Sequence, residues 1–359
     1  MTTATEREPL VVVVGSGGVG KTTLAAAMGL RSAREGRDTL VMTFDPSLRL
    51  RDTLGVATAP ADDEIRVPAD TKGELWAGLL DPHRTFDRLV TRYAPDESSR
   101  RRILENRFYR HLAGRLAGVL EYMAVERLYE VSTSGRFDRV ILDTPPTKQA
   151  IDFIEAPERI VGFLDSGALR IALRPWFDRD GHLKGVSRLG FIGRRFEAFL
   201  DRVVGLSLLH DMAEFFQAFA PLFDGFRQRA LEVQRLLRSP ACTFVLVSGA
   251  SEERIPDTMF FARRLEEAGY RLGSVVLNRV HPRIEGSVAP IEESASSAAA
   301  RALLGWLGER DHAGVSRLRE LLPEHALLAL PLLPTAPTDL AALAELGDAL
   351  AGEQVTRVR

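Results

Sequence analysis

The residues with the clearest chemical meaning form a glycine-rich run near the start of the chain. Residues 15–22 read GSGGVGKT and satisfy the pattern G-x-x-x-x-G-K-[ST], between an apolar stretch and an alanine-rich one. Glycines permit positive φ angles, so successive backbone amides can face phosphate oxygens at a helix N-terminus. The alternative is a glycine turn that binds nothing. It is disfavoured because the chain has only four lysines, and one of them stands where the pattern requires it.

Each position of this run has an expected contact with a bound nucleotide. Lys21 should reach the β- and γ-phosphates, and the Thr22 hydroxyl should bind Mg²⁺. The expected nucleotide-binding residues are Gly15, Ser16, Gly17, Gly18, Val19, Gly20, Lys21, Thr22 and Thr23.

Two aspartates follow apolar runs that we expect to be buried strands. Asp143 ends the run RVILD, and Asp45 comes directly after DTLVMTF. The carboxyl ends of parallel strands meet at the edge where doubly wound sheets bind ligands. Both carboxylates are therefore predicted to hold Mg²⁺ through water, beside Thr22. The alternative for each is that it only caps the helix that follows.

The elements that must position these residues alternate along the chain. Alternation of strands and helices predicts an α/β fold with a doubly wound, mostly parallel sheet, in which a helix over about residues 21–35 follows the phosphate loop. A last helix is expected over about 338–352, and residues 283–300, poor in bulky side chains, predict a mobile surface excursion. Short apolar runs predict strands at residues 10–14, 38–44, 75–80, 139–143, 243–247, 274–277 and 327–330.

Two stretches between the strands have helical rather than strand patterns. The second contains 11 of the 18 phenylalanines, and Pro221 should split one of its helices. These phenylalanines either form a core or line an exposed groove for a partner. We therefore expect a P-loop NTPase with an inserted α-helical subdomain. The predicted parts are a flexible N-terminus at 1–8, a nucleotide-binding domain of 9–82, 131–150 and 239–355, and a helical subdomain of 83–130 and 151–238.

Composition and charge exclude several classes of protein. A formal net charge of −2 gives no support for nucleic-acid binding. No window approaches the roughly 18 apolar residues of a membrane span, and the first residues do not form a secretory signal, so we expect a cytoplasmic protein without stable membrane insertion. The single cysteine, Cys242, fits a reducing compartment. Because the histidines also lack ligand spacing, no zinc site is predicted.

The chain resembles the ArsA family, which comprises arsenite-pump ATPases and the guided-entry ATPases that deliver tail-anchored membrane proteins. The resemblance implies an ATP- and Mg²⁺-dependent hydrolase that forms a homodimer and has a protein client. Two segments, LWAGLLDPHRTFDRLV (75–90) and GVLEYMAVERLYE (118–130), look most like the bacterial single-domain branch. The other resembling segments are GSGGVGKTT (15–23), FDPSLRLRDTLG (44–55), LDTPPTKQAIDFIEAP (142–157), VVLNRV (275–280) and LPLLP (330–334).

The same resemblance implies roles for individual residues. Asp45, the expected catalytic partner of Lys21, resembles the switch I aspartate that polarises the attacking water, and Asp143 begins switch II. Asn278 resembles the asparagine that reads adenine, since its amide both donates and accepts. Pro331 and Leu332 belong to a loop that packs against the base. A turn-forming asparagine is the alternative for Asn278.

Ser16 is the main departure from the family pattern. The family usually has a lysine there, which crosses the dimer to the partner's phosphates. Its absence predicts slow hydrolysis or a replacement cation, and Lys148, Arg49 and Arg51 are candidates for that cation. A lone cysteine also argues against capture of arsenite by several thiolates.

These observations predict a dimeric, Mg²⁺-dependent ATPase switch whose helical subdomain binds and releases a protein client. The client is either one defined apolar partner or a hydrophobic, tail-anchored segment. Three alternatives remain open: a positioning or scaffold ATPase of the MinD or ParA kind, a small-molecule kinase on the same fold, and an ATP-binding protein with very slow hydrolysis. ATP-dependent sedimentation with liposomes or DNA would favour the first of these.

Overall fold

The structure is a computed structural model that describes residues 8–44, 49–56, 64–107, 109, 119–165, 206–284 and 295–351. The chain divides into two compact units, which are described separately. The first unit contains residues 1–80, 131–151 and 235–359, and the second contains residues 81–130 and 152–234.

An eight-stranded sheet forms the centre of the first unit, in the order β3-β4-β2-β5-β1-β6-β7-β8. All neighbouring strands pair in parallel except β3, which is antiparallel to β4. The predicted α/β class with a mostly parallel sheet is therefore confirmed. The strands are β1 (Leu10–Gly15), β2 (Thr39–Thr43), β3 (Glu64–Arg66), β4 (Leu75–Leu79), β5 (Arg139–Asp143), β6 (Cys242–Ser248), β7 (Leu272–Val280) and β8 (Ala326–Pro331).

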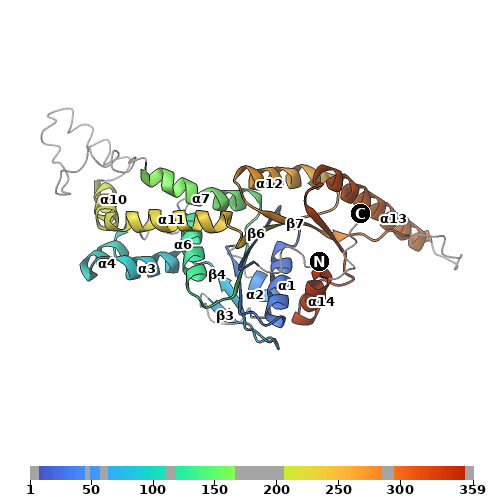
Figure 1. Cartoon of the computed structure of the whole chain (residues 1–359), viewed down its shortest axis with the longest axis horizontal. Helices are drawn as coiled ribbons and strands as arrows, with labels where there is room; N and C mark the ends of the chain where they lie inside the picture. The colour runs from blue at the N-terminus through green and yellow to red at the C-terminus, as the bar shows by residue number, and fades with distance from the viewer. Residues whose placement is uncertain are drawn as a thin grey trace, which may run out of the picture. The chain divides into compact units, whose positions relative to one another are not determined.

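Helices cover both faces of this sheet (Figure 1). On one face α1 (Lys21–Arg34) packs against α14 (Leu340–Ala351), and Leu24, Leu343 and Ile141 belong to one buried cluster there. On the other face α12 (Ile255–Glu267) contacts β1, β6 and β7. β1 and β6 are buried along their whole length because both faces of a central parallel strand are covered. The unit also contains α2 (Arg49–Thr53), η3 (Glu252–Arg254) and α13 (Ala295–Leu321).

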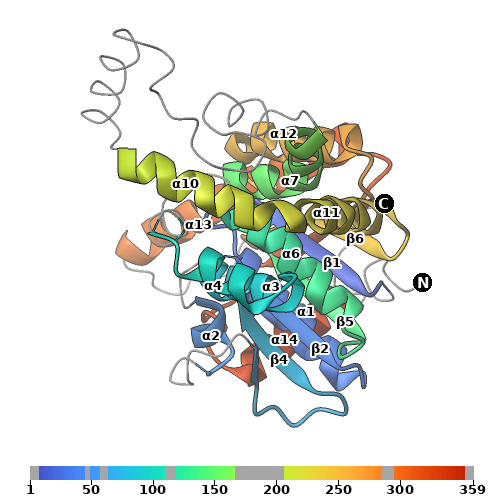
Figure 2. The same ribbon diagram turned by 90° about the vertical axis from the view of Figure 1, so that its left-hand side faces the viewer.

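The described residues of the second unit form helices and the short turns between them, with no strand among them. Pro221 lies in a short 3-10 turn between two helices that follow one another along the chain (Figure 2), so the predicted split is confirmed. Asp81 and Asp96 accept hydrogen bonds from Arg84 N and Ser99 N, which caps the first two helices. Three of its helices, α6, α7 and α11, begin in one unit and end in the other along the chain. The helices are α3 (Pro82–Tyr93), α4 (Glu97–Leu104), α6 (Val119–Thr133), α7 (Thr147–Asp165), α10 (Leu206–Phe219), η2 (Ala220–Leu222) and α11 (Phe223–Arg238).

Most described phenylalanines of the helical unit form its core. The rings of Phe86 and Tyr109 stack at a centroid distance of 4.5 Å, and Phe219 stacks on Phe215 at 5.4 Å. Phe226 completes the cluster at 5.7 Å from Phe219. For these buried rings the core interpretation holds, whereas four phenylalanines of the same stretch, at positions 177, 191, 196 and 199, lie outside the described residues.

Two expectations about the elements are wrong. The strand β3 was not predicted, because its three residues EIR contain a single apolar side chain and lie at the sheet edge. Residues 295–300, expected within a mobile excursion, begin the 27-residue helix α13, because their run of alanines favours a helix. Residues 285–294 of that excursion and 1–7 of the N-terminus lie outside the described residues.

Candidate functional site

The glycine-rich run forms a turn between the end of β1 and the start of α1, as its pattern predicts. Gly15, Gly18 and Gly20 have φ angles of 148°, 76° and 93°. A Cβ atom on Gly15 would lie 2.1 Å from the Val247 carbonyl oxygen of β6. A Cβ atom on Gly20 would lie 2.4 Å from Asn278 Nδ2. The loop therefore depends on glycine for both its backbone angles and its close approach to the neighbouring strands.

Replacing Gly20 by alanine is expected to weaken nucleotide binding about tenfold. The left-handed backbone costs a residue with a Cβ atom about 1–2 kcal/mol, and Asn278 must also move. Isothermal titration of ATP against the wild type and Gly20→Ala measures the effect. Gly18→Ala is the matched control, since its φ is also positive but no atom lies within 4 Å of the added Cβ. An equal loss in both variants would show that the Asn278 contact is unimportant.

The side chains of Lys21, Thr22 and Asp143 converge at the carboxyl end of the sheet. Lys21 is 7% exposed, and its Nζ donates to the Ser16 carbonyl oxygen at 2.9 Å. The Thr22 hydroxyl donates to Asp143 Oδ2 at 2.7 Å, although 121 positions separate these residues in the sequence. Thr43, at the end of β2, donates to the same oxygen at 3.1 Å. This contact of Thr43 was not predicted, and a threonine as the last residue of the strand before Asp45 was the only available signal.

The chemistry of this group fits a magnesium ion. Thr22 and Asp143 supply a hydroxyl and a carboxylate, and hard divalent cations prefer such oxygen ligands. Mg²⁺ usually keeps several waters and takes few protein ligands besides phosphate oxygens. No cluster of three or more histidine, cysteine, aspartate or glutamate side chains suited to a metal occurs among the described residues. A magnesium site of the P-loop kind does not need such a cluster.

Asn278 and Arg279, at the end of β7, lie against the glycine loop. Asn278 Nδ2 donates to the Val19 carbonyl oxygen at 2.9 Å, and its Oδ1 accepts from Arg279 N at 3.0 Å. Arg279 has a φ of 60°, the only positive φ of a non-glycine residue in the described part of the chain. Asn278 therefore supports the phosphate loop in this structure, and its reading of adenine stays a prediction.

The predicted base-packing loop lies at the next strand end. Leu332 N donates to the Val280 carbonyl oxygen at 2.8 Å, so Pro331 and Leu332 follow the same sheet edge as Asn278. Leu332 is 42% exposed. An exposed apolar side chain at this edge is available to a planar base, and this role too stays a prediction.

The predicted switch I residues and replacement cations are placed only in part. Asp45 and residues 46–48 lie outside the described residues, as does the side chain of Lys148. Arg49 is exposed on the short helix α2, while Arg51 is 7% exposed on the same helix. Another arginine, which the sequence analysis did not single out, reaches the phosphate loop: Arg254 Nη1 lies 3.5 Å from Ser16 Oγ.

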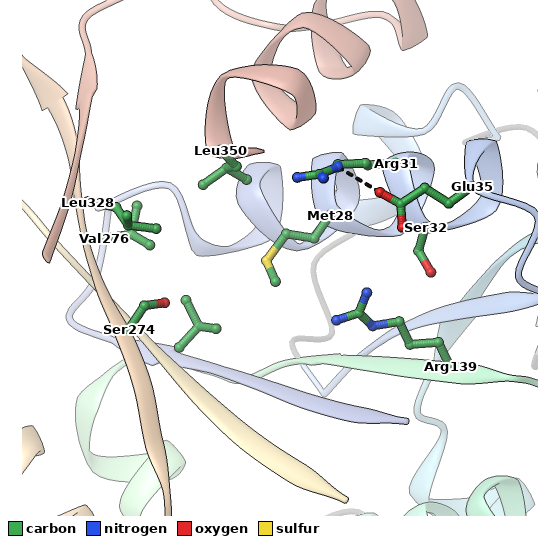
Figure 3. Close-up of a pocket in the computed structure, with 10 residues that line it drawn as sticks. Met28, Arg31, Ser32, Glu35, Arg139, Ser274, Val276, Leu328 and Leu350 are labelled. Atoms are coloured by element: carbon green, nitrogen blue, oxygen red, sulfur yellow. Dashed lines mark hydrogen bonds and ion pairs between the residues drawn. The ribbon is translucent and has the colours of Figure 1, made fainter. Parts of the chain in front are cut away.

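A separate cavity lies at the opposite end of the strands, between α1 and the sheet (Figure 3). Met28 and Arg139 extend into it, and Ser274 and Leu350 lie at its border. Its volume of about 30 Å³ suits a single water molecule rather than a nucleotide. Arg139 begins β5 and Asp143 ends it, so this cavity is not part of the phosphate site. Burial also lowers the pKa of Arg139, to about 10, and the nearby Arg37 charge adds to this effect.

Two properties of the chain bear on its wider chemistry. Cys242 is buried, and burial raises the pKa of its thiol, so this side chain stays protonated and unreactive. No described helix is both long and apolar enough to cross a membrane.

Part of the chain is similar in sequence to known ATPases. Residues 9–175 match the family model described as an anion-transporting ATPase, ArsA. ATPase get3 of Schizosaccharomyces pombe is 28% identical over 180 residues, which cover 49% of this chain and 52% of that protein. A putative arsenical pump-driving ATPase of Halobacterium salinarum is 28% identical, with 45% and 26% covered. The arsenical pump-driving ATPase of Escherichia coli is 25% identical, with 44% and 27% covered. The matches thus span between about a quarter and a half of these relatives.

Proposed function

Residues 9–175 belong to the ArsA family of ATPases, and from this premise we propose that the chain is an Mg²⁺-dependent ATP hydrolase that works as a dimeric nucleotide switch. In this proposal the binding of ATP brings the nucleotide-binding faces of two subunits together, and hydrolysis allows them to separate. The helical unit binds a protein client in one state and releases it in the other. We also propose that the protein acts in the cytoplasm.

The hydrogen bond between Thr22 and Asp143 is the observation that carries the proposal. It joins the first turn of α1 to the end of β5 at 2.7 Å, directly beside the buried Lys21. Thr22 and Asp143 would hold Mg²⁺ there, and the ion would supply positive charge to the phosphates. The chain's part is to hold the phosphates with loop amides and Lys21, and to orient the Asp143 carboxylate through the hydroxyls of Thr22 and Thr43. Asp45 is proposed to position the attacking water.

The path of the chain supports a link between this site and the helical unit. The helix α7 begins four residues after Asp143. Its residues 147–151 belong to the first unit, and residues 152–165 belong to the second. A movement of the segment after Asp143 on hydrolysis would therefore act on one end of a continuous helix. A nucleotide can drive such a switch only if the client binds the two states with different affinity.

Two measurements on the purified full chain test the proposal. The wild type is expected to release phosphate from ATP with Mg²⁺ and to stop when EDTA removes the metal. Light scattering after gel filtration is expected to show more dimer with Mg²⁺ and a non-hydrolysable ATP analogue than with ADP. A chain that neither hydrolyses ATP nor changes its oligomeric state with nucleotide contradicts the proposal.

The client is best sought with a variant held in its ATP state. Asp45→Asn is expected to bind ATP but to hydrolyse it slowly, so that a client-bound complex survives purification. Any partner recovered must then bind wild type at least tenfold differently with ATP and ADP, which corresponds to about 1.4 kcal/mol. Equal affinity with ATP, ADP and no nucleotide would exclude the switch. ATP-dependent sedimentation with liposomes or DNA would instead favour a positioning ATPase.

A further inference from the structure

Two arginines reach the phosphate loop from neighbouring strand ends. Arg254 follows β6 and places Nη1 3.5 Å from the Ser16 hydroxyl, while Arg279, in β7, places Nη1 3.4 Å from the Gly18 carbonyl oxygen. Within the described ranges, neither guanidinium forms an ion pair with a carboxylate. Other arginines do, for example Arg264 with Glu267 at 3.2 Å. Within these ranges, the positive charges of Arg254 and Arg279 are therefore not neutralised by a paired carboxylate.

The two arginines differ in what they can offer to a ligand. Arg279 is directed at a backbone carbonyl of the loop, so it supports the loop itself. Arg254 is directed at the side chain of Ser16, the second residue of the loop, and it is half-buried. Ser16 is 5% exposed and its side chain is uncharged, so the cation that the loop itself places beside Ser16 is Lys21, whose Nζ donates to the Ser16 carbonyl oxygen. Arg254 adds a second cation, on the side of the Ser16 hydroxyl.

Several contacts hold Arg254 in this place. Its carbonyl oxygen accepts from the Thr258 hydroxyl at 2.8 Å, and Thr258 is also hydrogen bonded to Ser248 at 2.7 Å. Both of these hydroxyl side chains are buried. A Cβ atom on Gly314 of α13 would lie 1.8 Å from the Ala250 carbonyl oxygen, so α13 packs directly on the loop that leads to Arg254. These contacts fix the backbone at Arg254, and so the point from which its side chain extends toward the loop.

We propose that Arg254 contacts the terminal phosphate of bound ATP and stabilises the charge that develops on it during hydrolysis, so that each subunit supplies this cation to its own site. This inference rests on the proposed ATPase function and deepens it. Phosphoryl transfer gains most from charge placed at the phosphate oxygens, and an arginine can be supplied from the same chain. The guanidinium suits the task because it is always charged and binds phosphate through two parallel hydrogen bonds.

The test compares Arg254→Gln, Arg254→Lys and the control Arg264→Gln, which changes an exposed arginine of α12, the helix that begins directly after Arg254. Affinities for ADP alone and for ADP with aluminium fluoride, a mimic of the transferring phosphate, are measured with Mg²⁺. Wild type is expected to bind the mimic more tightly than ADP. Arg254→Gln should lose at least tenfold of this preference and keep its ADP affinity within about threefold. Arg254→Lys should restore part of the preference, and Arg264→Gln should match wild type.

Single-turnover hydrolysis provides the second readout. Arg254→Gln is expected to slow it about a thousandfold, at the lower end of the range that arginine fingers supply. The wild-type rate per site should not change with protein concentration. An Arg254→Gln variant with normal rate and normal preference for the mimic overturns this inference alone. A wild type that binds no nucleotide overturns the proposed function as well, so the two failures are distinguishable.

Discussion

An Asp143→Asn variant is expected to hydrolyse ATP about a thousandfold more slowly than the wild type, a loss of about 4 kcal/mol in transition-state stabilisation. The amide keeps an oxygen that can accept from Thr22 and Thr43, so the fold should be retained. It removes the negative charge that we propose Asp143 contributes to the magnesium site. The variant should therefore also lose the dependence of ATP affinity on Mg²⁺, which titration with and without the metal measures.

Asp339→Asn is the matched control for this change. Asp339 Oδ1 accepts from Ala342 N at the start of α14, and asparagine caps helices as well as aspartate does. Its hydrolysis and unfolding temperature should equal those of the wild type. If Asp143→Asn retains hydrolysis within about threefold and still responds to Mg²⁺, the magnesium site has been assigned to the wrong carboxylate.

Removing one partner of the buried Glu126–Arg229 pair is expected to cost about 3–5 kcal/mol in the free energy of unfolding. Arg229 Nε donates to Glu126 Oε2 at 2.6 Å, and both side chains are about 95% buried. The Arg229 guanidinium also lies over the ring of Tyr93, 4.2 Å from its centroid. Glu126→Leu leaves a permanent buried charge on Arg229. Because Glu126→Leu also removes a carboxyl group whose folded pKa is raised, and which makes the wild type less stable as pH rises, its cost relative to wild type should be larger at pH 5 than at pH 8.

The reverse variant, Arg229→Met, should depend on pH. Burial raises the pKa of Glu126 from its ordinary value of 4.5 to about 7, against the lowering effect of Arg229. Because the folded pKa is the higher one, Glu126 makes the fold less stable as pH rises from about 4.5 to about 7. Without Arg229 this effect grows, so Arg229→Met should cost more at pH 8 than at pH 5, where Glu126 is protonated. Urea denaturation at the two pH values measures this difference.

Two controls separate the buried charge from the loss of packing. The double variant Glu126→Leu with Arg229→Met should recover most of the lost stability, because two apolar side chains leave no unpaired charge. Arg227→Met, on the same helix, breaks the exposed pair with Asp165 and should have no measurable effect. A double variant as unstable as the sum of the single ones would contradict the explanation.

Local sequence patterns determined much of the sheet unit. The run at residues 10–14 is apolar at every position, and it forms a strand that is buried on both faces. The glycines of the loop, with Lys21 and Thr22, predicted a turn of positive φ angles, and Gly18 and Gly20 have these angles. A phosphate loop is visible in one sequence because its chemistry depends on consecutive residues.

Only the tertiary structure showed the features of the site that depend on contacts between residues far apart in the sequence. Thr22 and Asp143 are 121 positions apart, and only the parallel pairing of β1 with β5 brings them to the same sheet edge. The same holds for Arg254, which is 238 positions from Ser16 and reaches it because β6 lies beside β1. Among 43 arginines, nothing in the local sequence distinguishes Arg254. The sequence by itself therefore identified the loop that we propose binds phosphate, whereas strand order determined which charged side chains surround it.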